Sequence, residues 1–222
     1  MNTQKAFTLV ELLCVVSLFG ILAALTMPAL QGSKAPQLST SGARLSGLME
    51  ASRQTAIVTR QPVVVAMLVA NTQTPQRFTT LQWVPSTSGD TGNWKQISKW
   101  EALPSGLLAD DTDSDGNPLE VFQPAKSPQL ASSRQLPDLV YGGADYKPGV
   151  SGGYGYIIFL PDGSLYQDDS SPSLPWVLRI VEASKTASGN IAYQGARNSV
   201  GRPANFFEIV LNATGQPKIV RP

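Results

Sequence analysis

The sequence contains no histidine among its 222 residues. Serine and cysteine nucleophiles activated by a histidine are therefore excluded, and so are zinc sites with histidine ligands. The glycine-rich stretch Gly152–Gly155 lacks the lysine of a phosphate-binding loop and leads into a predicted strand, which favours a tight bend. The carboxylate pairs Asp110–Asp111 and Asp168–Asp169 lie in polar segments, where solvated turns explain them better than acid–base chemistry. These features argue against an enzyme.

Cysteine and net charge are also scarce. Cys14 is the only cysteine and lies in an apolar run, so the rest of the chain has no disulfide to form. The 17 Lys and Arg residues against 16 Asp and Glu residues give a net charge of +1. A balance this close to neutral gives no electrostatic argument for a nucleic-acid or anionic partner.

A long apolar run, Phe7 to Leu30, begins near the start of the chain and contains one acidic residue, Glu11, and no basic one. About 20 apolar residues are what a helix needs to cross a bilayer. We therefore predict a transmembrane helix over residues 7–30. The single positive charge ahead of it, Lys5, keeps the amino end in the cytoplasm and places the following domain on the far side of the membrane.

The start of this run, Ala6-Phe7-Thr8-Leu9-Val10-Glu11, resembles the processing site of type IV prepilins. In that family a short leader, here residues 1–6, is removed before a Phe, and the new terminal amine is methylated. The resemblance implies as partners a prepilin peptidase and methylase, an inner-membrane assembly platform and other pilin or pseudopilin subunits. One residue departs from the family pattern, because Ala6 stands where a Gly is usual; we expect cleavage to persist, more slowly.

Glu11 is the one carboxylate of the apolar run, and a carboxylate inside hydrocarbon is usually paired. One explanation is that Glu11 lies near the membrane interface, where snorkelling lowers its cost. The resemblance to pilins implies another, in which Glu11 meets the terminal amine of Phe7 on a neighbouring subunit as the helices assemble.

Residues 31–60 are predicted to hold a loosened segment followed by an amphipathic helix. Pro28 predicts a kink, and Ser39 or Ser41 is a candidate cap for the second helix. One face of that helix is apolar or small: Leu45, Leu48, Met49, Ser52 and Ala56. We expect this face to pack against a sheet.

Residues 61–222 are predicted to form a β-rich domain. The pattern indicates a hairpin over 63–84, a second over 154–166, a strand over 176–181 and a closing hairpin over 206–220. Residues 85–151 are rich in Gly, Pro, Ser and Asp and are predicted to be long surface loops with short strands. The predicted fold class is α+β and pilin-like: a long kinked amino-terminal helix, transmembrane in its first half, packed on an antiparallel sheet.

The order of these pieces resembles the minor pseudopilins related to the H-type component of type II secretion. The stretches that carry this are ASRQTAIVTRQPVVVAM, NWKQISKWEALPSGLL, IIFLPDGSL and FEIVLNATGQPKIVRP. The function implied is a structural subunit of a type IV pilus or a type II secretion pseudopilus. One alternative is a membrane-tethered binding module, such as a tip adhesin or a DNA-uptake minor pilin, with a basic patch at Arg197, Arg202, Lys218 and Arg221. Another is a periplasmic enzyme on a signal anchor.

The segment from Asp110 to Asn117 matches half of a calcium loop. Asp111, Asp113 and Asp115 alternate before Gly116, as in the opening of a D-x-D-x-D-G loop. The second half fails, because Phe122 stands where the loop needs a bidentate Glu and the nearest carboxylate, Glu120, comes two residues early. An ordinary acidic turn is the favoured interpretation, with a weak calcium site as the alternative.

Overall fold

The computed structural model describes residues 9–30, 35–68, 76–87, 92–110, 134–148, 153–167, 175–186, 191–194 and 203–221. The chain divides into two compact units, Met1–Lys34 and Ala35–Pro222. Each is described on its own below.

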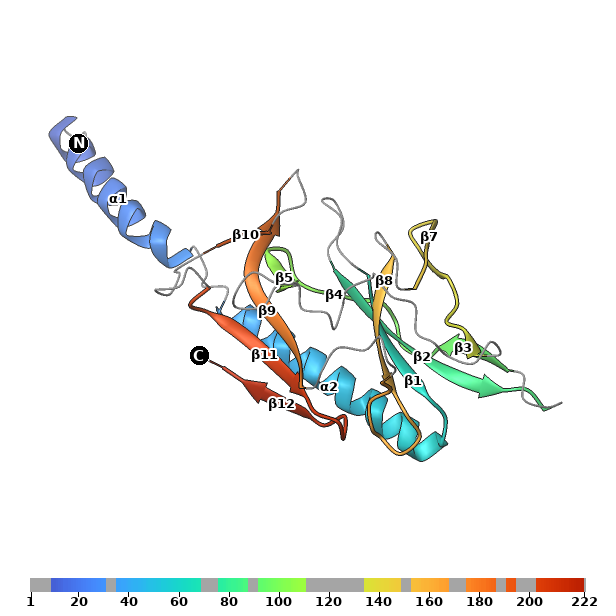
Figure 1. Cartoon of the computed structure of the whole chain (residues 1–222). Coiled ribbons are helices and arrows are strands. Elements are labelled where there is room, and N and C mark those ends of the chain that lie inside the picture. The colour runs from blue at the N-terminus through green and yellow to red at the C-terminus, as the bar shows by residue number, and fades with distance from the viewer. Residues whose placement is uncertain are drawn as a thin grey trace, which may run out of the picture. The chain divides into compact units, whose positions relative to one another are not determined.

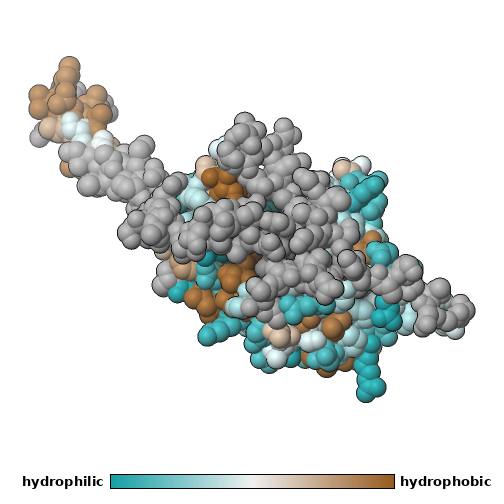
Figure 2. Space-filling view, in the orientation of Figure 1, coloured by the Kyte–Doolittle hydropathy of each residue, from teal (hydrophilic) through white to brown (hydrophobic). Residues whose placement is uncertain are grey.

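The first unit contains helix α1, Leu9–Leu30. Its described side chains are mostly hydrophobic (Figure 2), and Ser17 satisfies its hydroxyl within the helix by donating to the Leu13 carbonyl at 2.7 Å. Pro28 lies inside α1, two residues before its end. Within the described part of the chain, no helix has the combined length and hydropathy expected of a membrane-crossing segment. The helix predicted over residues 7–30 is confirmed from Leu9 to Leu30, and its membrane span stays a prediction.

Helix α2, Ala35–Thr59, opens the second unit. It begins before Ser39 and Ser41, so the predicted cap at either serine is wrong. Pro36 explains the earlier start, because a proline is tolerated in the first turn, where its missing N–H has no helical partner. The helix ends at Thr59, and the next residue, Arg60, adopts a left-handed φ of 55°.

The predicted packing face of α2 is largely confirmed. Leu45, Met49, Ser52 and Ala56 are buried, whereas Leu48 is only partly buried. Gly42 lies directly under the ring of Phe207, at a distance that leaves no space for a β-carbon. The absence of a side chain at this position lets α2 approach the sheet closely.

Beyond α2, the described residues of the second unit form two five-stranded antiparallel sheets and a small hairpin (Figure 1). The first sheet has the order β3-β2-β1-β8, with β4 also paired to β2. Its strands are β1 (Val63–Leu68), β2 (Arg77–Pro85), β3 (Gly92–Gln96), β4 (Glu101–Ala102) and β8 (Tyr154–Phe159). The predicted hairpin over 63–84 is confirmed, with Val65 opposite Thr80. The hairpin predicted over 154–166 is confirmed by the antiparallel bridge of Phe159 to Leu165 and by the backbone hydrogen bond that the Tyr166 N–H donates to the Ile158 carbonyl. Strand β8 also pairs along its length with β1.

The second sheet has the order β10-β9-β11-β12, with β5 also paired to β9. Its strands are β5 (Leu107–Asp110), β9 (Trp176–Lys185), β10 (Ile191–Tyr193), β11 (Phe206–Leu211) and β12 (Pro217–Val220). The predicted closing hairpin is β11 with β12. Strands β6 (Leu139–Tyr141) and β7 (Ala144–Tyr146) form the separate hairpin. The prediction of one sheet is therefore corrected to two.

Helix α2 joins the two sheets, because it contacts β1 and β8 of the first and β9, β11 and β12 of the second. The main core lies between them and includes Met49, Phe159 and Phe207. A second core lies around Tyr154 and Ile158, and the Tyr154 hydroxyl donates to the Pro137 carbonyl at 2.7 Å. Burial first, and then the nearby Asp138 carboxylate, raise the pKa of Tyr154 well above its usual value. The fold is α+β, as predicted.

Candidate assembly surfaces

The residues predicted to carry function fall largely outside the described part of the chain. Ala6 and Phe7 precede Leu9, and the predicted calcium ligands Asp111, Asp113 and Asp115 lie in the 111–133 gap. Glu11 belongs to α1 by its backbone, with no description of its side chain. Among the described residues, no group of three or more acidic, cysteine or histidine side chains is arranged to hold a metal ion. Calcium binding stays a prediction.

The exposed surface of α1 is the most apolar feature of the described chain. Large side chains from Leu9 to Phe19 are 45% to 81% exposed and occupy successive positions around the helix: Leu9, Val10, Leu12, Leu13, Val15, Val16, Leu18 and Phe19. A helix that is hydrophobic all round requires a lipid or protein environment, because each exposed Leu or Phe loses about 1.5–3 kcal/mol of burial free energy in water. The exposed apolar side chains of α1 therefore indicate a helix whose surface is covered by lipid or by protein.

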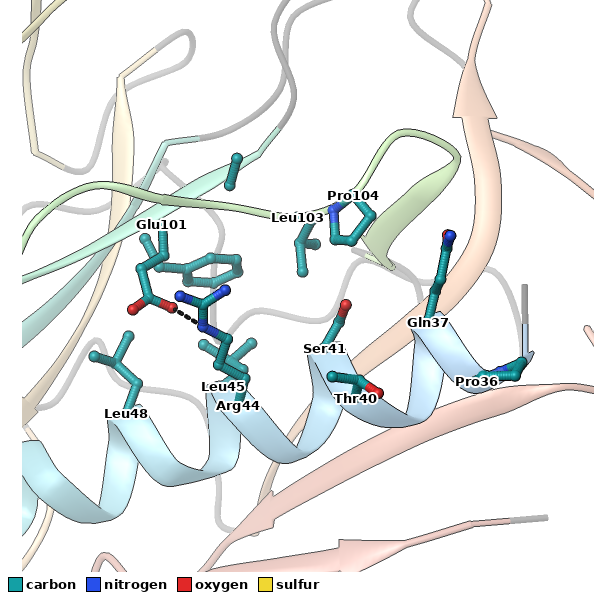
Figure 3. A pocket seen from close by; sticks show the side chains of 12 residues that line it. Pro36, Gln37, Thr40, Ser41, Arg44, Leu45, Leu48, Glu101, Leu103 and Pro104 are labelled. Carbon is teal, nitrogen blue, oxygen red and sulfur yellow. Dashed lines mark ion pairs between the residues drawn. The ribbon is translucent and has the colours of Figure 1, made fainter. Parts of the chain in front are cut away.

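A second apolar surface is a groove beside the first four turns of α2, which we call the α2 groove (Figure 3). It has a cavity volume of about 290 Å³ and lies between α2 and the segment from Glu101 to Pro104, with Phe78 of β2 among its lining residues. Thr40, Leu45 and Leu48 line it from α2, and Leu103 and Pro104 line it from the opposite side. The partial exposure of Leu48 follows from its position in this groove.

An ion pair stands at the edge of the α2 groove. Arg44 Nε lies 2.9 Å from Glu101 Oε2, and the two side chains are 68% and 34% exposed (Figure 3). A pair this exposed contributes about 0.2–1 kcal/mol to stability. Its main consequence is that the groove carries one positive and one negative charge that neutralise each other.

A buried row of charges crosses the second sheet. The strand register places Asp110 of β5 and Glu208 of β11 on either side of Arg179 of β9. Arg179 Nη2 and Nε lie 2.6 and 2.7 Å from Glu208 Oε1, and Arg179 Nη1 lies 3.9 Å from Asp110 Oδ2. The Tyr193 hydroxyl donates to Asp110 Oδ1 at 3.0 Å. Removal of one partner would leave buried charge uncompensated. The ion pairs therefore hold β5 and β11 to β9, the strand that carries Arg179.

The burial of Asp110 corrects the prediction of a solvated Asp110–Asp111 pair, since Asp110 is 4% exposed. All four residues of β5 are buried, so no alternation along the strand marks Asp110 in the sequence, and the cation that pairs with Asp110 is 69 positions away. Asp162, in contrast, occupies the exposed turn after β8, where hydrogen bonds from the Ser164 hydroxyl and backbone N–H hold its carboxyl pKa below the usual value.

Of the four residues of the predicted basic patch, the structure describes Lys218 and Arg221. Arg197 and Arg202 lie outside the described residues. Lys218 is exposed on β12, and the Arg221 guanidinium lies over the Phe207 ring at 5.2 Å. A nucleic-acid partner stays a prediction.

Comparison with known proteins gives one match in sequence. Residues 1–27 match the family model described as "Prokaryotic N-terminal methylation motif". No curated protein is significantly similar to the chain in sequence. Two structures of the minor pseudopilin EpsH from the type II secretion system of Vibrio cholerae are similar at 14% identity and a TM-score of 0.41. They cover 84% and 86% of this chain and 98% and 97% of their own chains. A TM-score this low supports no inference about the present chain.

The motif match spans the predicted leader, Phe7 and Glu11, and it continues through most of α1. The amino-terminal segment of this chain therefore carries a prokaryotic N-terminal methylation motif.

Proposed function

We propose that the chain is a structural minor pilin or pseudopilin subunit. In this proposal a prepilin peptidase removes residues 1–6, Phe7 becomes the methylated amino terminus, and the mature chain enters a type IV pilus or a type II secretion pseudopilus. The observation that carries the proposal is the match of residues 1–27 to the prokaryotic N-terminal methylation motif.

The apolar surface of α1 supports a double role for the amino-terminal segment. Before assembly, residues 7–30 anchor the chain in the inner membrane with the following domain in the periplasm. A helix of 22 residues is roughly 33 Å long, close to the thickness of the hydrocarbon core. On assembly, the lipid around α1 is replaced by the α1 helices of neighbouring subunits, whose side chains are equally apolar.

Glu11 has a defined task in this proposal. It is the one acidic or basic residue between Phe7 and Leu30, and cleavage creates a positive charge at the Phe7 amine. A carboxylate and an ammonium group attract each other strongly in a low-dielectric environment, and each compensates the desolvation of the other. Pairing between subunits therefore sets the register at which one α1 enters beside the next.

The second unit supplies a rigid body for the filament surface. Helix α2, which follows α1 in sequence, packs against both sheets. The helix and the two sheets therefore move as one piece. The inner-membrane assembly platform and the other subunits are the partners of this cycle, and the proposal assigns no catalytic step to the chain.

The proposal is tested by expressing the full chain with and without a prepilin peptidase. The peptidase should shorten the wild-type chain by the six residues Met1–Ala6. Ala6→Leu is the control, because a bulky side chain beside the cleaved bond should leave the chain at full length. A wild-type chain of the same mass with and without the peptidase would contradict the proposal.

A further inference from the structure

We infer that Arg77 binds a carboxylate of another protein molecule, from the side chain of an aspartate or a glutamate. Arg77 is the first residue of β2, and its guanidinium carbon lies 4.5 Å from the centre of the Tyr141 ring on β6. The Tyr141 ring makes an edge contact with the ring of Trp100, with 5.5 Å between the ring centres. We call these three residues the Arg77 site. The inference does not depend on the proposed function.

The Arg77 site contains a positive charge that the described chain does not compensate. Three of the described arginines are partly buried. Two of them have a carboxylate partner, because Arg53 lies 3.3 Å from Glu50 and Arg179 lies 2.6 Å from Glu208. No hydrogen bond or ion pair joins the Arg77 side chain to another described residue, and in this part of the chain its Nε is the one buried side-chain nitrogen or oxygen without a partner. A partly buried charge without a partner is rare because its desolvation is costly.

The acidic residue of the neighbouring strand is on the opposite face of the sheet. Glu101 of β4 lies opposite Phe78 of β2, and Phe78 belongs to the main core beside α2. Glu101 lies on that same face, where it pairs with Arg44 of α2 at 2.9 Å. Successive residues of a strand point to opposite faces, so Arg77 is on the other face. Neither β2 nor β4 therefore offers Arg77 a carboxylate.

The geometry of the guanidinium fits a carboxylate. Tyr141 covers one face of the planar group and Nε is buried, so the two Nη atoms, which have no partner and are not buried, are left for a ligand. Their N–H groups lie in one plane and match the two oxygens of a carboxylate. One carboxylate also carries one negative charge, which equals the charge of Arg77. A phosphate group carries about −1.5 to −2 charges and would leave negative charge beside the electron-rich ring faces of Tyr141 and Trp100.

The residue types of the Arg77 site favour a protein as the source of the carboxylate. Arg, Tyr and Trp are the types enriched among the residues that contribute most to protein–protein binding. Tyr141 and Trp100 are partly exposed. Their rings therefore offer apolar surface for the side chains that flank an acidic residue of the partner.

The test converts the contact into a covalent bond. Arg77→Lys places an amine near the position of the guanidinium carbon. A carbodiimide joins an amine to an adjacent carboxylate as an amide, and the reagent takes up the water that is lost and becomes a urea. Cells producing the full chain are treated with a carbodiimide, and the chain is isolated, digested and analysed by mass spectrometry. The expected product is a branched peptide that links position 77 to an aspartate or glutamate of another protein molecule.

Arg134→Lys is the matched control. Arg134 also lies over an aromatic ring, Trp83 at 5.7 Å, but it is exposed to solvent. The branched peptide at position 77 should be at least several-fold more abundant than any branched peptide at position 134 of the control.

A second measurement keeps the natural arginine and uses acetate as the probe. Sodium acetate should raise the melting temperature of the purified full chain in detergent above its value in sodium chloride of equal ionic strength, because a ligand that binds the folded chain stabilises it. Arg77→Met keeps an unbranched side chain beside the Tyr141 ring and removes the guanidinium. This variant should fold and should show no such rise.

The inference is overturned if position 77 of Arg77→Lys is unmodified, is modified no more than position 134 of the control, or carries only a small acid. It is also overturned if the linkage lies within one chain, or if acetate raises the melting temperature of Arg77→Met as much as that of the wild type. None of these outcomes depends on cleavage before Phe7, so failure of this contact is distinguishable from failure of the proposed function.

Discussion

Arg179 is the residue whose replacement tests the buried charge row most sharply. Arg179→Met keeps an unbranched side chain that can still pack beside the Phe206 ring, over which the guanidinium lies at 5.5 Å. It removes the cation between Asp110, whose side chain is 1% exposed, and Glu208, whose side chain is 15% exposed. The variant thus isolates the loss of charge compensation.

The expected cost follows from these exposures. Loss of one partner of a buried ion pair lowers the free energy of unfolding by about 3–5 kcal/mol, because the remaining charge is uncompensated. For a domain of this size, about 2–4 °C of melting temperature correspond to each kcal/mol, so the shift should be roughly 6–20 °C. Adding Glu208→Gln to Arg179→Met should restore part of the loss, since one of the two uncompensated carboxylates is then neutral.

The assay is urea unfolding of the compact unit Ala35–Pro222, followed by circular dichroism. Arg44→Met is a matched control, because it breaks an ion pair of similar length at 2.9 Å whose Arg side chain is 68% exposed. The control should lose at most about 1 kcal/mol. If Arg179→Met costs no more than Arg44→Met, the charge row does not hold β5 to β9 and β11.

Three further outcomes are expected. Gly42→Val should lower the free energy of unfolding by about 1–3 kcal/mol, because the valine side chain meets an aromatic ring of β11. Gly47→Ala should raise the free energy of unfolding by about 0.5–1 kcal/mol, because a β-carbon at this position has open space around it. Equal thermal melting curves for the two glycine variants would be inconsistent with this packing. Glu11→Ala should leave the chain folded and membrane-bound but reduce its incorporation into filaments, as measured in the sheared-filament fraction; normal incorporation would remove the proposed pairing with the terminal amine. Millimolar calcium should raise the melting temperature of the full domain if residues 111–115 bind the ion. The double variant Asp113→Ala with Asp115→Ala should abolish this rise. A rise that survives in the double variant would show that the segment is an ordinary acidic turn.

Local patterns in the sequence predicted the elements whose stabilising contacts are close in the chain. The β1–β2 and β11–β12 hairpins follow from apolar runs that flank turn residues, and the strands of each pair antiparallel as predicted. The buried face of α2 follows from helical spacing. Each of these depends on neighbours within about twenty positions.

The errors concern pairings between distant segments. Nothing in the local pattern of Tyr154–Phe159 says that this strand also pairs along its length with Val63–Leu68. The division into two sheets and the burial of Asp110 beside Arg179 depend on the same kind of distant pairing. The start of α2 differs from the prediction for a local reason, because Pro36 fits the first turn of a helix that begins before the candidate caps Ser39 and Ser41.

The α2 groove illustrates a further limit of sequence reasoning. Leu48 has the spacing of a core residue, and the sequence predicts its burial with Leu45 and Met49. Its neighbours across the groove, Leu103 and Pro104, come from a segment that was predicted to be a surface loop. The distinction between a core position and a groove position therefore requires the tertiary structure.

The central claim is that the chain is a processed subunit of a pilin-like filament, and the mass of its mature amino-terminal peptide tests this most directly. The chain is isolated from the cells that make it, digested and analysed by mass spectrometry. The account predicts a peptide that begins at Phe7 with a methylated amine and lacks Met1–Ala6. A mature chain that retains Met1–Ala6, or that begins downstream of the apolar run, would contradict it.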